Sequence, residues 1–192
     1  MTDAQPQVPK ILLTGKFRSG KTVVADYIRY QHGFTEIAFG SMLKYFAAQV
    51  FAHSEVTKGA GKNRQLLQSF GQACRSVDEN VWLQHAEFSY RLAMNGRDTK
   101  GIVISDGRQP NEIEWAKSQG FAVVRITAPE DVRLARAVAE GDDFKPADLT
   151  HETESYTDGF AVDYEIVNDG TLGDLYAQVD AVIAKIKEAE CL

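Results

Sequence analysis

One stretch near the N-terminus has the residue types and spacing of a phosphate-binding loop. Residues 15–22 read Gly-Lys-Phe-Arg-Ser-Gly-Lys-Thr, which is the pattern G-x4-G-K-[ST]. They follow the apolar run 11–13 and precede a segment with helical periodicity, the strand–loop–helix context that gives this motif its meaning. A glycine loop can reach this pattern by chance, but the spacing, the Lys-Thr pair and both flanks favour the functional interpretation.

The chemistry expected of this loop is binding of a nucleoside triphosphate. Its glycines allow a tight curl whose N–H groups surround phosphate oxygens, and the helix N-terminus adds partial positive charge. Lys21 would reach the β- and γ-phosphates, and the Thr22 hydroxyl would ligate Mg²⁺. ATP and Mg²⁺ are therefore the expected cofactors. The predicted nucleotide-binding residues of the loop are Gly15, Phe17, Arg18, Ser19, Gly20, Lys21 and Thr22.

A second candidate group follows the apolar run 102–105. Asp106 ends a Walker-B-like pattern, and its carboxylate would face the loop, holding Mg²⁺ through water or orienting the attacking group. The alternative is an aspartate that caps a loop. Arg108 would lie beside the same crevice, where its planar guanidinium can hold an acceptor phosphate in bidentate fashion. We predict catalytic roles for both residues.

Arg133 and Arg136 lie three residues apart on a predicted helix that leads into the acidic segment 141–159. Phosphoryl transfer spreads charge over three oxygens, and arginines on a closing flap can neutralise that charge while excluding water. The alternative is a solvated helix face, with Arg136 paired to Glu140. Spacing alone does not separate these two interpretations.

Further candidates for an acceptor site lie in the middle of the chain. Lys44, Arg64 and Arg75 are candidate cations, although each alone is more often a surface charge. Phe70 and Trp82 could stack on a base, although aromatic residues at helical spacing more often belong to a core.

Two other polar groups have simpler interpretations. His151, Glu152 and Glu154 suggest a metal site, but nothing else in the sequence supports one, and a hydrogen-bonding cluster is preferred. Asn168, which begins an Asn-Asp-Gly triplet, is a turn residue by composition.

The hydrophobic pattern that must position these residues alternates between strands and helices. The predicted strands are residues 10–14, 35–39, 102–106, 121–127 and 164–167. The predicted helices cover 20–31, 41–50, 66–74, 81–92, 110–119 and 129–140, with a last one after Thr171. Such alternation predicts a parallel sheet with helices on both faces, whose ligands bind beyond the carboxyl ends of the strands.

Local signals place several ends of these elements. Gly33 should stop the first helix, Ser41 should cap the second, and Ser76 should open a capping box for the helix over 81–92. Thr171, three residues before an aspartate, should cap the last helix. We interpret 53–61 as a loop and 141–159 as a mobile flap, because both are polar.

Composition fits one soluble domain over residues 1–192. A formal net charge of −6 and a pI of about 5.2 argue against a broad non-specific nucleic-acid surface. Cys74 and Cys191 lie far apart without metal-like spacing, so reduced thiols are expected. The polar N-terminus lacks the apolar core of a signal peptide, and no run reaches the length of a membrane span. We therefore expect a cytoplasmic protein.

The motifs together resemble the deoxynucleoside monophosphate kinases of bacteria and phages, within the wider group of P-loop nucleoside monophosphate kinases and dephospho-CoA kinases. The resemblance covers nearly the whole chain. Its most distinctive part after the phosphate loop is the Asp-x-Arg-x-Pro-Asn-Glu block over 106–112. The other matching stretches are 39–44, 64–71 with Arg75 and Trp82, 151–154 and 166–172.

The resemblance implies an α/β three-layer sandwich with a five-stranded parallel sheet in the order 2-3-1-4-5. A helical acceptor-binding region would cover about 40–95, and a lid would cover about 140–159. The implied acceptor-phosphate ligands are Lys44, Arg75 and Arg108. Arg133 and Arg136 would contact the transferring phosphoryl group, and the Asn168 loop would pack against the donor adenine.

The chain also departs from the family pattern. The segment 141–159 contains no arginine, so cations at the lid must come from the helix before it. Gly107, inside the distinctive block, leaves the base preference unassigned.

The leading hypothesis is phosphoryl transfer from ATP to a (deoxy)nucleoside monophosphate. Alternatives are a kinase for another small acceptor such as dephospho-CoA, or for a modified base in DNA, which the acidic pI disfavours. A nucleotide-binding switch is a third reading; the guanine-reading Asn-Lys-x-Asp is absent, and position 109 is Gln where such a switch needs glycine. The base, the sugar and a homodimeric state stay open.

Overall fold

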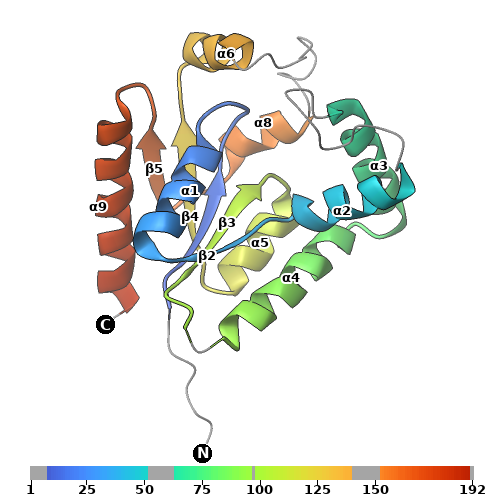
Figure 1. Ribbon diagram of the computed structural model, residues 1–192, viewed down its shortest axis with the longest axis horizontal. Helices are drawn as coiled ribbons and strands as arrows, with labels where there is room; N and C mark the ends of the chain where they lie inside the picture. The colour runs from blue at the N-terminus through green and yellow to red at the C-terminus, as the bar shows by residue number, and fades with distance from the viewer. Residues whose placement is uncertain (1–7, 52–62, 97, 140–151, 191–192) are drawn as a thin grey trace, which may run out of the picture.

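A five-stranded parallel sheet forms the centre of the molecule (Figure 1). The computed structural model describes residues 8–51, 63–96, 98–139 and 152–190. The strands are β1 (Lys10–Thr14), β2 (Thr35–Ile37), β3 (Ile102–Gly107), β4 (Ala122–Thr127) and β5 (Tyr164–Val167). They lie in the order β2-β3-β1-β4-β5, which confirms the predicted fold class and strand order.

Eight described helices surround this sheet. They are α1 (Lys21–His32), α2 (Gly40–Val50), α3 (Arg64–Val77), α4 (Val81–Met94), α5 (Pro110–Ser118), α6 (Glu130–Ala139), α8 (Glu152–Gly159) and α9 (Leu172–Glu190). α2, α3 and α4 lie together at one side of the sheet, and α6 lies above the loop between β1 and α1 (Figure 1). Within the described ranges, no helix is both long and apolar enough to cross a bilayer.

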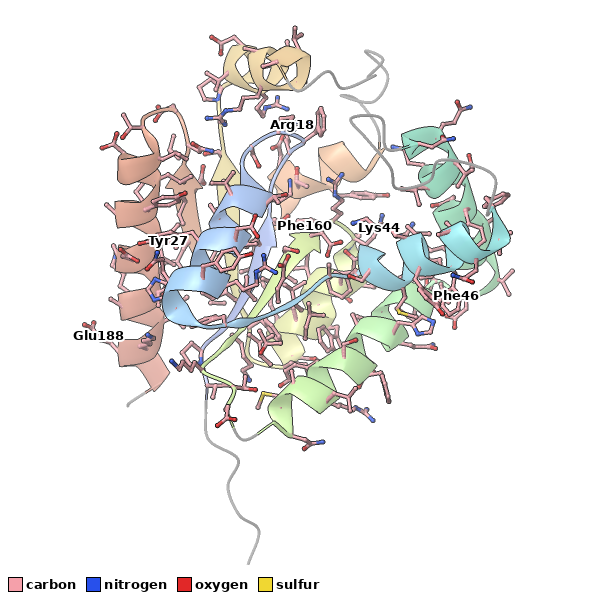
Figure 2. All side chains as sticks on the ribbon, viewed as in Figure 1. Arg18, Tyr27, Lys44, Phe46, Phe160 and Glu188 are labelled. Atoms are coloured by element: carbon pink, nitrogen blue, oxygen red, sulfur yellow. The ribbon has the colours of Figure 1, made fainter. Side chains whose placement is uncertain are left out.

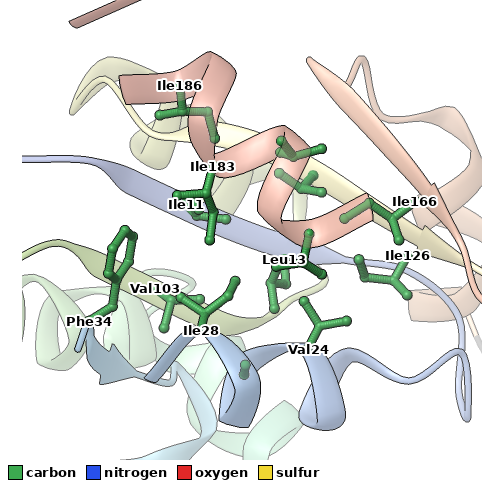
Figure 3. Packing of buried hydrophobic residues seen from close by; sticks show 14 of the residues in the cluster. Ile11, Leu13, Val24, Ile28, Phe34, Val103, Ile126, Ile166, Ile183 and Ile186 are labelled. Atoms are coloured by element: carbon green, nitrogen blue, oxygen red, sulfur yellow. The ribbon is translucent and has the colours of Figure 1, made fainter. Parts of the chain in front are cut away.

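The two faces of the sheet bury separate apolar clusters, because successive strand residues point to opposite sides. Ile11 and Leu13 of β1 pack with α1 and α9 on one face. Leu12, between them in sequence, packs with α4 and α5 on the other face. Figure 3 shows the first cluster, in which Val24 of α1 and Ile183 of α9 lie close to the strand residues. These two layers fix α1, and with it the phosphate loop, against the carboxyl end of β1.

Several predicted boundaries are confirmed. Gly33 ends α1 in the left-handed conformation, and its N–H donates to the carbonyl of Arg29. Thr171 and Asp174 form a capping box at the start of α9, in which each side chain accepts the other residue's backbone N–H. Both ends depend only on neighbours in sequence.

The predicted entry into α2 is wrong in two respects. β2 ends at Ile37 rather than residue 39, and Ser41 lies inside α2 instead of capping it. The reason is a side chain from β3: Asp106 accepts the backbone N–H groups of Phe39 and Gly40, so the chain leaves the strand early and needs no serine cap.

The predicted capping box before α4 is also wrong. α3 continues to Val77, so Ser76 lies within that helix, and its hydroxyl donates to the carbonyl of Ala73. α4 begins after Asn80, whose N–H donates to the side chain of Asp78.

The predicted flap over 141–159 is partly helical, since residues 152–159 form α8. The carbonyl end of α8 receives hydrogen bonds from Arg125 of β4, a contact that polar composition does not reveal. The rest of that segment, and the predicted loop over 53–61, lie outside the described residues.

Candidate active site

The phosphate loop joins β1 to α1, and its glycines are required by contact as well as by conformation. Gly15 and Gly20 have φ values of 141° and 105°, where side chains are rare. A Cβ on Gly15 would lie 2.2 Å from the carbonyl oxygen of Ile126, and one on Gly20 would lie 2.2 Å from Nδ2 of Asn168. The loop therefore packs closely against β4 at Gly15 and against the turn after β5 at Gly20.

Lys21 extends back over this loop. Its Nζ donates to the carbonyls of Gly15 at 2.6 Å and Lys16 at 2.8 Å, and the residue is buried. Thr22, the next residue, is exposed on the first turn of α1. The ammonium thus lies inside the curl of the loop, where a phosphate chain would replace the carbonyl contacts with stronger ionic ones.

Arg18 adopts a backbone conformation that favours glycine. Its φ is 59°, and it is the only non-glycine residue with a positive φ among the residues that the structure describes. Such strain costs on the order of 1 kcal/mol and is typical of ligand-binding loops. The guanidinium lies over the ring of Phe17, 5.4 Å from its centroid. Figure 2 labels Arg18 at the tip of the loop.

The two arginines of α6 contact the loop from outside. Arg133 donates to the carbonyl of Phe17 at 3.3 Å and Arg136 to that of Arg18 at 3.4 Å. Arg133 is only 7% exposed, so the solvated-face alternative does not apply to it. Glu140, the suggested partner of Arg136, lies outside the described residues.

Asn168 joins the phosphate loop to the end of β5 and is buried, so it does more than form a turn. Its Nδ2 donates to the carbonyl of Ser19 at 2.9 Å, and its N–H donates to the carbonyl of Thr127. Arg136 donates to both the carbonyl and the side-chain oxygen of Asn168 at 3.2 Å. The structure thus places the nucleotide-loop residues, Asn168 and Arg136 together.

A pocket of about 270 Å³ opens beside the loop, between β4, α6 and α8. Lys16, Arg125 and Arg133 contribute cationic side chains to it. Lys16 pairs with Asp158 of α8 at 2.6 Å, and Arg125 donates to carbonyls at the end of the same helix. Arg125 was missed by the sequence reasoning, although a single charge in the apolar strand pattern 122–127 is a detectable signal.

The ends of β3 and β2 form the other side of the site. Asp106 accepts from the N–H groups of Phe39 at 2.8 Å and Gly40 at 2.9 Å, which matches the capping alternative. Each carboxylate oxygen keeps further acceptor capacity. Lys44 lies nearby, because a Cβ on Gly40 would be 3.9 Å from its Cε and 3.1 Å from the Asp106 carboxylate. Figure 2 labels Lys44 on α2.

Glu112 lies behind Arg108 and is the other residue that sequence reasoning missed. Its Oε2 accepts from the backbone N–H of Arg108 at 2.8 Å and of Gln109 at 2.9 Å. Burial, and secondarily the charge of Asp106, raise its pKa to about 7, against the opposing effect of those N–H groups and the charge of Arg75. The capping-box spacing from Gln109 to Glu112 was the available signal.

The remaining candidates separate clearly. Trp82 is buried, donates to the carbonyl of Gly71, and packs 6.1 Å from the ring of Phe70, so the structure places it in the core of α3 and α4. Arg64 begins α3, and no side-chain position is described for it. His151 lies outside the described residues, as do the side chains of Glu152 and Glu154. In the described ranges, no cluster of three metal-ligating side chains occurs.

The fold matches that of solved P-loop small-molecule kinases. No known protein-family profile matches the chain. A curated protein from Acanthamoeba polyphaga mimivirus, named "putative deoxynucleotide monophosphate kinase", is 26% identical over 191 residues, covering 87% of this chain and 92% of that protein. The resemblance drawn from the motifs is thereby confirmed.

Solved structures of small-molecule kinases share the fold. A gluconokinase from Sinorhizobium meliloti superposes with a TM-score of 0.58 at 18% identity, covering 94% of each chain. A shikimate kinase from Bacteroides thetaiotaomicron superposes with a TM-score of 0.51 at 14% identity, covering 93% of this chain and 98% of the other. These similarities extend over nearly the whole of each chain. The shared feature is therefore the entire three-layer fold and not only the phosphate loop.

Proposed function

We propose that the protein is an ATP-dependent phosphotransferase that converts a (deoxy)nucleoside monophosphate to its diphosphate. The proposal rests chiefly on one arrangement: a phosphate loop containing Lys21 lies between Asn168 on one side and the Asp106–Arg108 end of β3 on the other. A donor and an acceptor phosphate could thus meet above the carboxyl ends of the strands. The name of the mimivirus relative agrees with a deoxynucleotide acceptor.

The loop fits a triphosphate by its chemistry. Two glycines let the loop curl where a Cβ would clash with Ile126 or Asn168, and Lys21 supplies a buried ammonium. The hydroxyl of Ser19 is buried without a hydrogen-bond partner, so it is available to a phosphate oxygen. Phe17, Arg18 and Gly20 complete the loop backbone whose N–H groups would surround the β-phosphate.

Asn168 and Arg136 would form the donor-base end of the site. Asn168 borders the loop at Ser19, and Arg136 lies against Asn168, so the two residues extend the nucleotide site away from the transferring phosphate. Arg133 donates a hydrogen bond to the carbonyl of Phe17 and also lines the pocket beside α8. We infer that Arg133 is the arginine of α6 placed to neutralise the transferring phosphoryl group.

The acceptor would bind between α2, α3 and the end of β3. Lys44, Arg75 and Arg108 supply the cations for its phosphate, and Arg64, Phe70 and Trp82 belong to the helices that would shape the base pocket. Because Trp82 is buried, it would define the pocket wall rather than close over the base.

Thr22 and Asp106 would hold Mg²⁺. A magnesium ion there would neutralise phosphate charge during transfer. Thr22 is an exposed residue on the first turn of α1, and Asp106 keeps acceptor capacity beyond the two backbone N–H groups that it accepts. The protein's own contribution is the alignment of donor and acceptor and the neutralisation of their charge.

A coupled assay for ADP release tests the proposal directly. The purified protein is incubated with Mg-ATP and each ribo- or deoxynucleoside monophosphate, with parallel reactions containing dephospho-CoA, DNA or no acceptor. We expect release that depends on a monophosphate and yields the corresponding diphosphate. Turnover with dephospho-CoA or DNA alone would identify another kinase, and acceptor-independent hydrolysis alone would identify a nucleotide switch.

A further inference from the structure

Glu112 occupies an unusual place for a capping residue. A glutamate at the third position of a helix usually lies at the surface, where it accepts the N–H at the helix start. Here the residue is only 4% exposed, and its carboxylate accepts N–H groups of the two residues that follow β3. One of the two N–H groups that it accepts belongs to Arg108, the predicted acceptor-phosphate ligand. A cap of α5 is therefore also a support for the site.

The residues on either side of Arg108 fix the rest of the acceptor region. Asp106 accepts the first N–H groups at the entry to α2, the helix that contains Lys44. Asn111 donates to the side chain of Asn80 at 2.9 Å, in the turn between α3 and α4. The block 106–112 thus connects α2, the α3–α4 turn and α5. Within it, Glu112 accepts the backbone N–H groups of Arg108 and Gln109, where the chain passes from β3 to α5.

The charge of Arg75, on α3, also acts on Glu112. It lowers the pKa of that side chain by less than burial and the charge of Asp106 raise it. Nη1 of Arg75 lies 3.5 Å from the position of a Cβ on Gly71. Glu112 therefore interacts with two candidate acceptor-site cations. It accepts the backbone N–H of Arg108, and it is subject to the charge of the Arg75 side chain.

We propose that Glu112 is the positioning residue of the acceptor-phosphate site, holding the backbone of Arg108 so that its guanidinium meets the acceptor. This inference rests on the proposed function. Glu112 is buried behind the site, and it acts through the backbone N–H groups of Arg108 and Gln109 and through its electrostatic interaction with Arg75. Loss of Glu112 should weaken acceptor binding. The phosphate loop follows the neighbouring strand β1 but is held by Asn168 and the arginines of α6, so it should stay unchanged.

Three substitutions separate this role from a purely structural cap. Glu112→Ala removes both N–H contacts, Glu112→Asp keeps the charge but shortens the side chain by one methylene, and Glu112→Gln keeps an oxygen that can accept both. The matched control is Asp174→Ala, which removes a capping box at α9, far in sequence from the acceptor elements. KM for each substrate, kcat and the melting temperature are measured for all four.

We expect the KM for the monophosphate to rise about tenfold or more in Glu112→Ala and Glu112→Asp, while the KM for ATP stays within about twofold. Glu112→Gln should recover most of the acceptor KM, and Asp174→Ala should lower the melting temperature without changing either KM. If the alanine variant does not fold, the aspartate variant provides the same test.

An unchanged acceptor KM in Glu112→Asp, or equal increases for both substrates, would overturn the positioning role. A wild-type protein that phosphorylates no monophosphate would instead refute the proposed function, and this result would be apparent before any variant is compared.

Discussion

The side-chain amide of Asn168 donates to the carbonyl of Ser19 across 2.9 Å, which fastens the turn after β5 onto the phosphate loop. Gly20 makes this contact feasible, because any side chain there would meet Nδ2 of Asn168 at 2.2 Å. Arg136 completes the arrangement by donating to the other side-chain atom, Oδ1. The shape of the phosphate loop therefore depends on a residue near the opposite end of the chain.

Replacing Asn168 with alanine should weaken Mg-ATP binding. The loss of a buried hydrogen bond costs about 1–3 kcal/mol, which corresponds to roughly fivefold to 150-fold in affinity. Isothermal titration with a non-hydrolysable ATP analogue measures this change. Gln178→Ala is the matched control, because Gln178 bonds to Val167 beside Asn168 without reaching the loop. Equal affinities in the wild type and Asn168→Ala would contradict the linkage.

Replacing Lys21 with methionine should abolish most turnover. The substitution keeps the length of the side chain but removes the buried ammonium, whose charge is expected to contribute about a thousandfold to the rate of transfer. The coupled assay measures kcat, and the melting temperature reports whether the variant folds. Lys185→Met, on an exposed position of α9, should behave like the wild type. Undiminished turnover in Lys21→Met would refute the assigned role.

Replacing Asp106 with asparagine tests its two candidate roles together. An amide side chain keeps one acceptor oxygen, so one of the N–H groups of Phe39 and Gly40 loses its partner, at a cost of about 1–3 kcal/mol. We also expect the Mg²⁺ concentration for half-maximal activity to rise, since a carboxylate ligand is lost. A lower melting temperature with an unchanged Mg²⁺ requirement would leave Asp106 as a cap alone.

The titration of Glu112 should make stability depend on pH. Its pKa is about 7 in the folded protein against 4.5 ordinarily, so the folded state binds more protons between these values. The free energy of unfolding then falls as the pH rises from about 4.5 to 7, by about 3 kcal/mol in total, and stays low above that range. Urea unfolding at pH 5 and pH 8 measures the difference.

Glu112→Gln should remove this contribution, because it keeps the acceptor and loses the titration. Asp174→Asn should leave the slope between pH 5 and 8 unchanged: hydrogen bonds from Thr171 lower the pKa of Asp174 below its usual 3.8, so its effect on stability appears only under more acidic conditions. A pH slope that is the same in the wild type and Glu112→Gln would contradict the assignment.

Local sequence signals were sufficient to predict several elements of the fold. The phosphate loop follows from eight consecutive residues, and the strands follow from apolar runs that matched β1 and β5 at both ends. The stop at Gly33 and the capping box from Thr171 to Asp174 depend on residues within one helical turn. Strand order followed from the resemblance of the motifs and was confirmed.

The contacts between side chains distant in sequence could not be predicted and depend on how the elements pack. Asp106 replaces the predicted serine cap of α2, and Arg125 supports the end of α8, because strands adjacent in the sheet are distant in sequence. Asn168, a turn residue by composition, became the anchor of the phosphate loop only when β5 packed beside β4. Glu112 acquired its burial and raised pKa in the same way, since desolvation depends on what packs around a group and sequence spacing does not record it.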